Sequence, residues 1–408
     1  MYTTIKEYYP SVAQVLLVLA LVLFSSSASF GQEHTVLGHT EDGQTKSHDH
    51  SEKGEFNAGD MIMEHISDAY DVHLWGHTSI PLPVILYTDA GLHVFSSGSF
   101  DHGHAVVESK GEHFVLAAGK VYQTDEHGTL MYCVANESNP EVCDSETAVN
   151  FADTHHSGFE APDGSLALQR PMDFSITKSV FGLLFVLVLV CILFLAAAKG
   201  YKKRPGQAPK GITNALEPLI LFVRDEIAIP SIGKKHAHRF MPFLLTVFFF
   251  IWLCNLLGLI PFIGGFNITG TLSVTMVLAA IVFVITTVNA NKHYWGHILW
   301  PPGVPLPIKF ILIPIEIVGI FLKPIVLMVR LTANITAGHI IILAFVSLVL
   351  IFGKGGEAMG AGFGVGIGAT LFMIFMFFIE LLVAFLQAFV FTLLAALYFG
   401  DATQEAHH

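Results

Sequence analysis

Residues 310–352 read FILIPIEIVGIFLKPIVLMVRLTANITAGHIIILAFVSLVLIF, and a second long apolar run extends from Val365 to Gly400. A glycine-rich loop, Gly353 to Gly364, separates the two runs. At about 1.5 Å per residue, each run is longer than the roughly 30 Å of hydrocarbon in a bilayer. Each must therefore tilt, kink or lie partly along the membrane, and Pro314 and Pro324 are placed to help a kink. The pattern predicts a long antiparallel hairpin of membrane helices.

Shorter apolar runs precede this hairpin, and together they predict five crossings. The nine Lys and Arg residues between positions 199 and 240 place that loop in the cytoplasm, because cytoplasmic loops are enriched in positive charge. The interrupted apolar segment Leu216–Ile229 is expected to be an interfacial cytoplasmic helix. The fold class is therefore an all-α polytopic membrane protein, with a small exported N-terminal segment of mixed or β character. The expected crossings are about 179–198, 241–265, 271–290, 310–352 and 365–400.

The composition divides the chain into two physically different parts. Of its 408 residues, 53% are hydrophobic and 13% are charged, which excludes a single soluble globule. Residues 32–175 hold 24 Asp and Glu against 5 Lys and Arg, whereas residues 176–408 hold 8 against 15. The acidic part would repel phosphates, so nucleic acid and an anionic membrane surface are excluded as its electrostatic partners.

The first 31 residues have the layout of a secretory signal peptide. Lys6 precedes an apolar run from Val12 to Phe24, and small residues follow as far as Gly31. An additional N-terminal membrane helix is the alternative, since Glu7 weakens the basic character of the region. The predicted domains are a signal peptide at 1–31, an acidic His-rich exported segment at 32–175 and a membrane domain at 176–408.

The exported segment offers a possible disulfide and a possible metal site. Cys133 and Cys143 can pair in an oxidising compartment, whereas Cys191 and Cys254 lie in apolar runs and are expected to be packing residues. Fourteen of the 21 histidines lie here, but no Cys/His set has the spacing of metal ligands. Solvated surface histidine is therefore favoured over metal binding.

Two further patterns predict local structure in the exported segment. Val84–Thr88 and Leu92–Ser96 flank Asp89-Ala90-Gly91, which predicts a β-hairpin. Met61–Trp75 has apolar residues near helical spacing, which predicts an amphipathic helix on the membrane or against a partner.

The long hairpin contains more polar residues than anchoring in lipid requires. A charge at the bilayer centre costs about 2.5–3.5 kcal/mol even on the lenient insertion scale, so such residues usually mark an ion pathway or a paired site. Seven residues of this kind occur in the two runs: Glu316, Lys323, Arg330, Asn334, His339, Glu380 and Gln387.

Spacing indicates which of these residues lie together. Glu316, Lys323 and Arg330 are seven apart and share a helical stripe with Asn334. In a symmetric hairpin, residues at equal depth have numbers that add up to about 717. This register pairs Arg330 with Gln387 in mid-membrane and His339 with Glu380 closer to the exported side.

The chemistry of these groups predicts a divided proton path. Arg330 stays protonated even when poorly solvated, so it attracts a carboxylate but carries no proton through. His339 and Glu380 titrate and suit a proton relay, and Glu316 can line a separate exit. Two half-paths separated by a fixed cation need a mobile carboxylate on another subunit to carry the proton between them.

Structural explanations compete with this hypothesis at several positions. Arg330 can be a salt-bridge partner of Glu316 or Glu380 without a further role. Lys323 is more readily explained as a structural or snorkelling residue, and Asn334 as a hydrogen bond across helices. Gly338 is expected to permit close helix approach.

These residues in this order resemble subunit a of the F-type ATP synthases, over roughly 59–77 and 171–400. The matching motifs are Pro314-Ile-Glu316, Lys323-Pro324, Val329-Arg330-Leu331 with Asn334, Ala337-Gly338-His339, Glu380 with Leu386-Gln387-Ala388-Phe389, Asn255-Leu-Leu-Gly-Leu-Ile-Pro261, and Asn267, Thr269 and Thr271.

The resemblance implies a proton-translocating stator subunit. It implies that Arg330 keeps the carboxylate of the c ring ionised and separates two half-channels, with Gln387 as the polar partner opposite. It implies a titrating inlet at His339 and Glu380, and Glu316 in the cytoplasmic half-channel. The implied partners are c-ring subunits, the peripheral stalk subunit b and other ATP synthase subunits, in a bacterial inner membrane with the N-terminal segment outside and the C-terminus in the cytoplasm. No cofactor and no catalysis by the chain itself are expected.

Residues 78–170 depart from the family pattern, which gives them no role. A secondary transporter and a membrane-anchored metal-binding protein are the alternative functions, although no convincing repeat of helices supports the transporter. The coupling ion, proton or sodium, is left open by the sequence.

Overall fold

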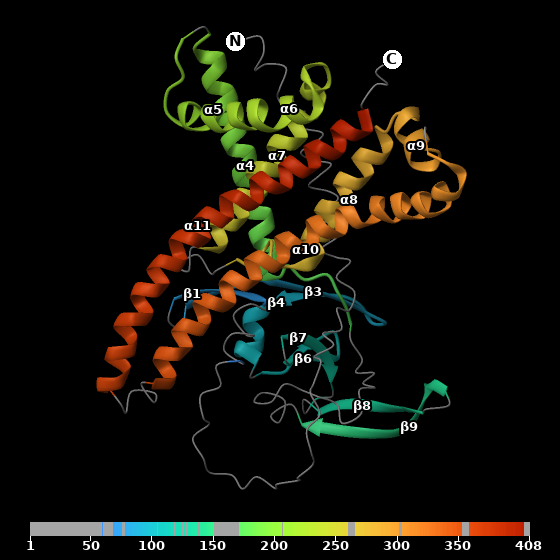
Figure 1. Cartoon of the computed structure of the whole chain (residues 1–408). Coiled ribbons are helices and arrows are strands. Elements are labelled where there is room, and N and C mark those ends of the chain that lie inside the picture. Colours follow the sequence, from blue (N-terminus) through green and yellow to red (C-terminus); the bar gives the residue numbers. More distant parts are fainter. Residues whose placement is uncertain are drawn as a thin grey trace. The chain divides into compact units, whose positions relative to one another are not determined.

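The computed structural model describes residues 59, 68–75, 78–103, 105–117, 119–124, 126, 129–136, 139–150, 171–205, 207–259, 266–301, 304–352 and 359–403. The chain divides into two compact units. One comprises Ser67–Phe185 with Ile260–Ile268 and is mostly β-structure. The other contains the helices from Val186 onward (Figure 1). The predicted domain boundaries remain predictions, and the proposed signal peptide lies outside the described residues.

In the described part of the β unit, the strands form four small antiparallel sheets. Their strand orders are β1-β2, β10-β3-β4, β5-β6-β7 and β8-β9. The strands are β1 (Asp71–Trp75), β2 (Thr78–Pro81), β3 (Pro83–Thr88), β4 (Gly91–Ser96), β5 (Val107–Ser109), β6 (Glu112–Ala117), β7 (Lys120–Thr124), β8 (Thr129–Asn136), β9 (Asn139–Asn150) and β10 (Met172–Asp173), with the 3-10 helix η1 at Ser97–Gly103.

The predicted hairpin is confirmed as β3 and β4. Thr88 pairs with Gly91 across the Asp89-Ala90 turn, and Gly91 adopts a φ of +108°, which favours glycine. The inner face of the hairpin contributes Val84 and Leu86 to a core that also contains Phe114. Alternation along the two strands therefore places one face in the core.

The helix predicted over Met61–Trp75 is wrong where it can be compared. Asp71–Trp75 forms strand β1, paired antiparallel with β2, and residues 61–67 lie outside the described part. Tyr70 is buried in the core, and its hydroxyl donates a hydrogen bond to Asp173. Burial, together with the nearby Asp173 carboxylate, raises the pKa of Tyr70 well above its usual range.

The helical unit confirms the predicted fold class. Among the described residues, four helices are long and apolar enough to cross a membrane, and a fifth crossing results if α8 and α9, bent by 102°, count as one. The helices are α4 (Lys178–Lys203), α5 (Ile212–Phe222), the π-helix η3 (Val223–Ala228), α6 (Ile229–Ile232), α7 (Lys234–Gly258), α8 (Leu272–Val288), α9 (Lys292–Leu299), α10 (Leu306–Phe352) and α11 (Met359–Thr403).

Two helix starts differ most from those expected. α7 begins at Lys234 rather than Met241, because its first two turns are basic and hydropathy does not detect them. α11 begins at Met359, within the stretch predicted as a loop. Inside a bilayer a helix satisfies its own backbone hydrogen bonds, and this outweighs the cost of glycine, about 1 kcal/mol relative to alanine.

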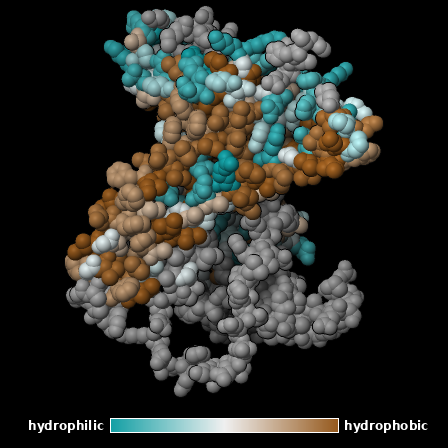
Figure 2. Space-filling model, in the orientation of Figure 1, coloured by the Kyte–Doolittle hydropathy of each residue, from teal (hydrophilic) through white to brown (hydrophobic). Residues whose placement is uncertain are grey.

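The segment predicted as an interfacial helix is helical, and one side of it packs into the helical unit. α5, η3 and α6 follow one another, and Val223 and Ile227 are fully buried. The Phe222 ring lies 5.8 Å from that of Phe385 and 5.6 Å from that of Phe389, both on α11. Figure 2 shows hydrophilic residues gathered near α5 and α6, while hydrophobic residues cover most of the α10–α11 hairpin and a hydrophilic group interrupts them partway along it.

Candidate functional site

The α10–α11 hairpin is close to the predicted register near its loop and drifts away from it. Val349 lies against Gly366, and the residue numbers of this pair add up to 715. The rings of Phe345 and Phe372 lie 4.2 Å apart, and their residue numbers add up to 717. Gly338 meets Glu380, at 718, whereas Lys323 reaches Asp401, at 724. The α10 and α11 ribbons lie side by side in Figure 1. The drift is what two helices that cross at an angle produce.

α10 presents opposite faces to its surroundings. Leu327, Leu331 and Ile335 are buried at helical spacing, and Thr332 hydrogen-bonds Thr275 of α8 at 2.7 Å. Arg330 and Asn334 lie exposed, one turn apart. Packing on α8 therefore fixes the rotation of α10 and turns the arginine outward from the chain.

The side chain of Arg330 has no counter-ion within the described chain. Among the residues that the structure describes, no carboxylate forms an ion pair with it. The structural salt bridge to Glu316 or Glu380 that the sequence allowed is thus not formed. In the same described part, no hydrogen bond joins Arg330 to Gln387, which is 5% exposed and lies on the buried side of α11.

Glu380 is buried against the backbone of α10. Its side chain is 6% exposed, and a Cβ added at Gly338 would overlap the carboxylate, lying 2.6 Å from Oε2. His339 is the next residue along α10 and is partly buried. The structure therefore brings Glu380 beside Gly338 and the following His339, as the register predicted. The missing side chain of Gly338 leaves room for the Glu380 carboxylate in addition to allowing close approach of the two helices.

A buried polar contact fixes α11 between Glu380 and Gln387. Asn255 of α7 donates from Nδ2 to the Ala384 carbonyl at 3.2 Å, and the Thr269 hydroxyl donates to Asn255 Oδ1 at 2.6 Å. Both polar residues are nearly fully buried. The sequence identified Asn255 and Thr269 only through family motifs, since a hydrogen bond between distant segments leaves no periodic signal.

We expect Asn255→Leu to lower the free energy of unfolding by about 1–2 kcal/mol, because it removes both bonds and leaves the buried Thr269 hydroxyl unpaired. Denaturant unfolding of the detergent-solubilised chain measures the change. Asn289→Leu is the matched control, since Asn289 Nδ2 bonds only Ile285 O within its own helix, at 2.7 Å. Equal losses in the two variants would refute the tethering role.

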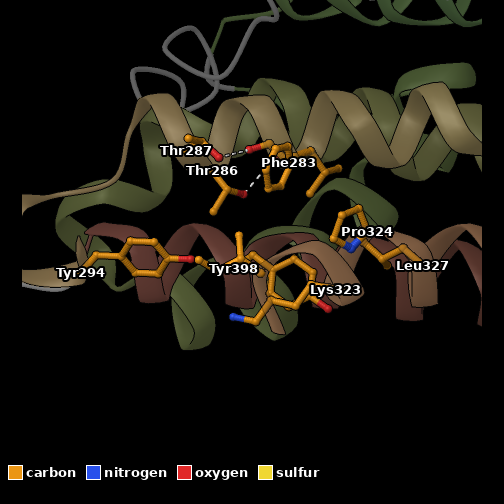
Figure 3. Close-up of a pocket in the computed structure, with 10 residues that line it drawn as sticks. Phe283, Thr286, Thr287, Tyr294, Lys323, Pro324, Leu327 and Tyr398 are labelled. Carbon is orange, nitrogen blue, oxygen red and sulfur yellow. Dashed lines mark hydrogen bonds between the residues drawn. The ribbon is translucent and has the colours of Figure 1, made fainter. Parts of the chain in front are cut away.

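A small cavity adjoins the stripe of α10 that carries Glu316. It is partly open and is lined by residues of α8, α9, α10 and α11. Figure 3 shows Tyr294, Tyr398 and Lys323 around it, with Thr286 and Thr287 hydrogen-bonded to carbonyls of their own helix. Ile320 and Lys323 lie one and two turns from the partly buried Glu316.

Lys323 has the structural role that the sequence favoured. Its Nζ lies 3.6 Å from Asp401 Oδ2 and 5.0 Å from the centre of the Tyr398 ring. The sequence register placed neither partner opposite Lys323. Its long stem and the drift of the hairpin bring the three residues together.

The structure bears on metal and thiol chemistry only for the described part of the chain. Within it, no group of three or more His, Cys, Asp or Glu residues is arranged to hold a metal ion. Cys191 and Cys254 are free thiols, and Cys254 is buried. Backbone pairing sets Cys133 opposite Glu146 and Cys143 opposite Ala135. Their side chains lie outside the described ones. The same holds for six closely spaced histidines of the N-terminal part: His48, His50, His102, His104, His155 and His156.

Comparison with known protein families gives two matches. The ATP synthase A chain family matches residues 180–400, and a domain of unknown function matches residues 61–145. The first covers the hairpin with all six candidate residues: Glu316, Arg330, Asn334, His339, Glu380 and Gln387.

Individual relatives agree with the family match. The chain is 43% identical over 243 residues to ATP synthase subunit a 2 of Chlorobaculum tepidum, covering 57% of this chain and 65% of that protein. It is 39% identical over 270 residues to ATP synthase subunit a of Chlorobium phaeobacteroides, with 64% and 75% covered. It is 35% identical over 312 residues to ATP synthase subunit a of Chloroherpeton thalassium, covering 74% of this chain and 88% of that protein. The last match covers more residues than the chain holds from Lys178 onward, so it includes some residues that precede α4. The chain belongs to the ATP synthase A chain family.

Proposed function

We propose that this chain is the proton-translocating stator subunit of an F-type ATP synthase. It provides two half-channels to and from a carboxylate of the c ring and couples ion flow to ring rotation. It performs no ATP chemistry itself. In this proposal the protein is a multi-pass component of the bacterial inner membrane, with its N-terminal segment outside and its C-terminus in the cytoplasm. Family membership favours this function over the transporter and metal-binding alternatives.

The observation that carries the proposal is the exposed side chain of Arg330. It lies on a helix apolar enough to span a membrane and has no ion-pair partner among the described residues. A charge left in this way costs about 2.5–3.5 kcal/mol at the bilayer centre, so a carboxylate from a second chain is the expected partner. The relatives are named as subunits of ATP synthase, which supplies the ring as the source of that carboxylate.

The remaining candidate residues divide between two half-paths. Glu380, buried beside the Gly338–His339 step, and His339 form the inlet on the exported side. Glu316 and the cavity that adjoins its stripe form the cytoplasmic exit. Asn334 and Gln387 supply neutral polar groups near the arginine. Because guanidinium does not release its proton, the proton crosses from one half-path to the other only on the ring.

We expect Glu380→Gln combined with His339→Ala to reduce ATP-driven acidification of inverted vesicles by roughly tenfold or more, since a positioned proton-transfer group typically contributes about 10²–10⁴-fold. Co-purification of a small two-helix ring protein verifies that the complex assembles. Glu226→Gln, at an exposed carboxylate on η3, is the control and is expected to pump normally. Unchanged proton conductance in the double variant would remove both residues from the path.

A further inference from the structure

The sheet β10-β3-β4 carries exposed apolar side chains on the face that points away from the core. One face packs into the core through Val84, Leu86 and Phe95. An antiparallel sheet with only one buried face normally carries polar residues on the other. Here the second face is also largely apolar, and seven of its eight side chains are exposed. The residues of this outer face are Pro83, Ile85, Tyr87, Leu92, Val94, Met172 and Phe174, with Ser96 at its edge.

Backbone bonds join this sheet to the start of the first membrane helix. Phe174 N bonds Ile85 O at 2.8 Å, and Ile176 N bonds Pro83 O at 3.1 Å, which prolongs the β10 pairing toward α4. Lys178 N, the first of the helix, bonds Ala69 O at 2.7 Å, and Ser179 N bonds Asp68 Oδ1 at 2.9 Å. Sheet and helix start therefore form one rigid piece within the β unit.

The position of α4 along the chain indicates the environment of this outer face. α4 is a candidate membrane span, and its exposed residues Val188, Ile192 and Leu195 form an apolar stripe for lipid. Met172 lies six residues before Lys178, at most about 20 Å along an extended chain. The outer face is thus continuous along the chain with a lipid-facing surface and lies within reach of the headgroup region.

We propose that the outer face of the β10-β3-β4 sheet inserts into the interfacial layer of the outer leaflet and anchors the exported domain to the bilayer. An exposed apolar patch of this kind marks a membrane or protein interface. Tyr87 and Phe174 are of the aromatic type that concentrates at the membrane surface. No residue of the face is charged, so insertion uses apolar contact and does not conflict with the acidic composition of the segment.

Spin labels on the reconstituted complex test this proposal. Leu92→Cys and Val94→Cys carry the label on the outer face; Val188→Cys is the lipid reference and Glu108→Cys, exposed on β5, is the water reference. The vesicles are phosphatidylcholine with a minor fraction of phosphatidylglycerol. The background replaces the four native cysteines: Cys133, Cys143, Cys191 and Cys254.

We expect the ratio of oxygen to nickel-chelate accessibility at Leu92 and Val94 to exceed that at Glu108 several-fold and to approach that at Val188. The ratio should not depend on the phosphatidylglycerol fraction, since no charge is involved. A ratio like that of Glu108 overturns the proposal, because the face is then in water. Low accessibility to both reagents also overturns it, because protein then covers the face.

A second measurement avoids removal of the cysteines. Val94→Trp in the otherwise unchanged chain adds one fluorophore to the four native tryptophans. Lipids brominated near the headgroup end of the acyl chain are expected to quench this additional emission. Emission that brominated lipids leave unchanged contradicts insertion, whatever the cysteine-free background does.

Discussion

Arg330→Ala is expected to abolish ATP-driven proton pumping and to increase passive proton leak through the assembled complex. The carboxylate that meets Arg330 would be left in lipid without its counter-ion, at a cost of about 2–5 kcal/mol, so coupled transport should fall by roughly 30-fold or more. The same substitution removes the fixed cation between the half-paths. Acidification of inverted vesicles measures the coupled flux, and decay of an imposed pH gradient without ATP measures the leak.

The neighbouring lysine provides the matched control. Lys323 lies on the same stripe of α10, but it has Asp401 and Tyr398 as partners within the chain. Lys323 also lines the cavity of the proposed exit, so Lys323→Ala should lower the coupled flux, but by less than Arg330→Ala, although both remove one positive charge from the same helix. Arg330→Lys is expected to lose coupled proton flux as Arg330→Ala does. The reason is that an ammonium group in a poorly solvated site loses its proton readily, whereas guanidinium does not. Undiminished coupling in Arg330→Ala refutes the central role of the arginine.

The membrane helices were the most predictable part of the fold. An apolar run of about 20 residues has few alternatives to a membrane helix, so runs such as Ser179–Ala198 identified α4 and its neighbours directly. Helix starts were less predictable at α7, where Lys234 and Lys235 open a helix whose first turns are not apolar. Hydropathy indicates the length of the apolar part of a helix but does not detect helical turns of polar residues that extend beyond it.

The strand at Asp71–Trp75 shows what periodicity in a short segment cannot decide. Tyr70 and Leu74 are four apart, as on a helix face, yet β1 pairs with β2 from Asp71 to Trp75. Five residues satisfy both periods, and pairing with a second strand decides between them. The pairing of β1 with β2 is seen in the structure and could not be deduced from the periodicity of the segment alone.

The candidate residues were identifiable because charged groups in apolar runs are few and costly. The contacts among these residues were harder to predict. The register counted from the loop placed Glu380 near His339 correctly, but it did not predict that Lys323 pairs with Asp401. The bond from Asn255 to the Ala384 carbonyl depends on how α7 packs against α11. Such contacts follow from three-dimensional packing rather than from any local pattern.

Gly338→Ala is expected to reduce proton conductance by roughly tenfold or more while the complex still assembles, because it displaces a proton-transfer group without removing it. The added Cβ would overlap the Glu380 carboxylate, which is buried and must shift to make room. Alanine is the better helix former, by about 0.5–1 kcal/mol relative to glycine, so loss of the α10 helix does not explain a defect. Proton pumping and complex assembly are measured on the same membranes.

A control and a rescue separate this mechanism from a general effect of methyl groups on α10. Nothing lies within 4 Å of a Cβ built at Gly319 of the same helix, so Gly319→Ala should conduct normally. Adding Glu380→Asp to Gly338→Ala withdraws the carboxylate by one methylene, about 1.5 Å, and should restore part of the lost conductance. If Gly338→Ala conducts normally, Glu380 does not act from the position that the structure gives it. If it fails and the aspartate does not rescue it, the defect lies in helix packing and not in the carboxylate.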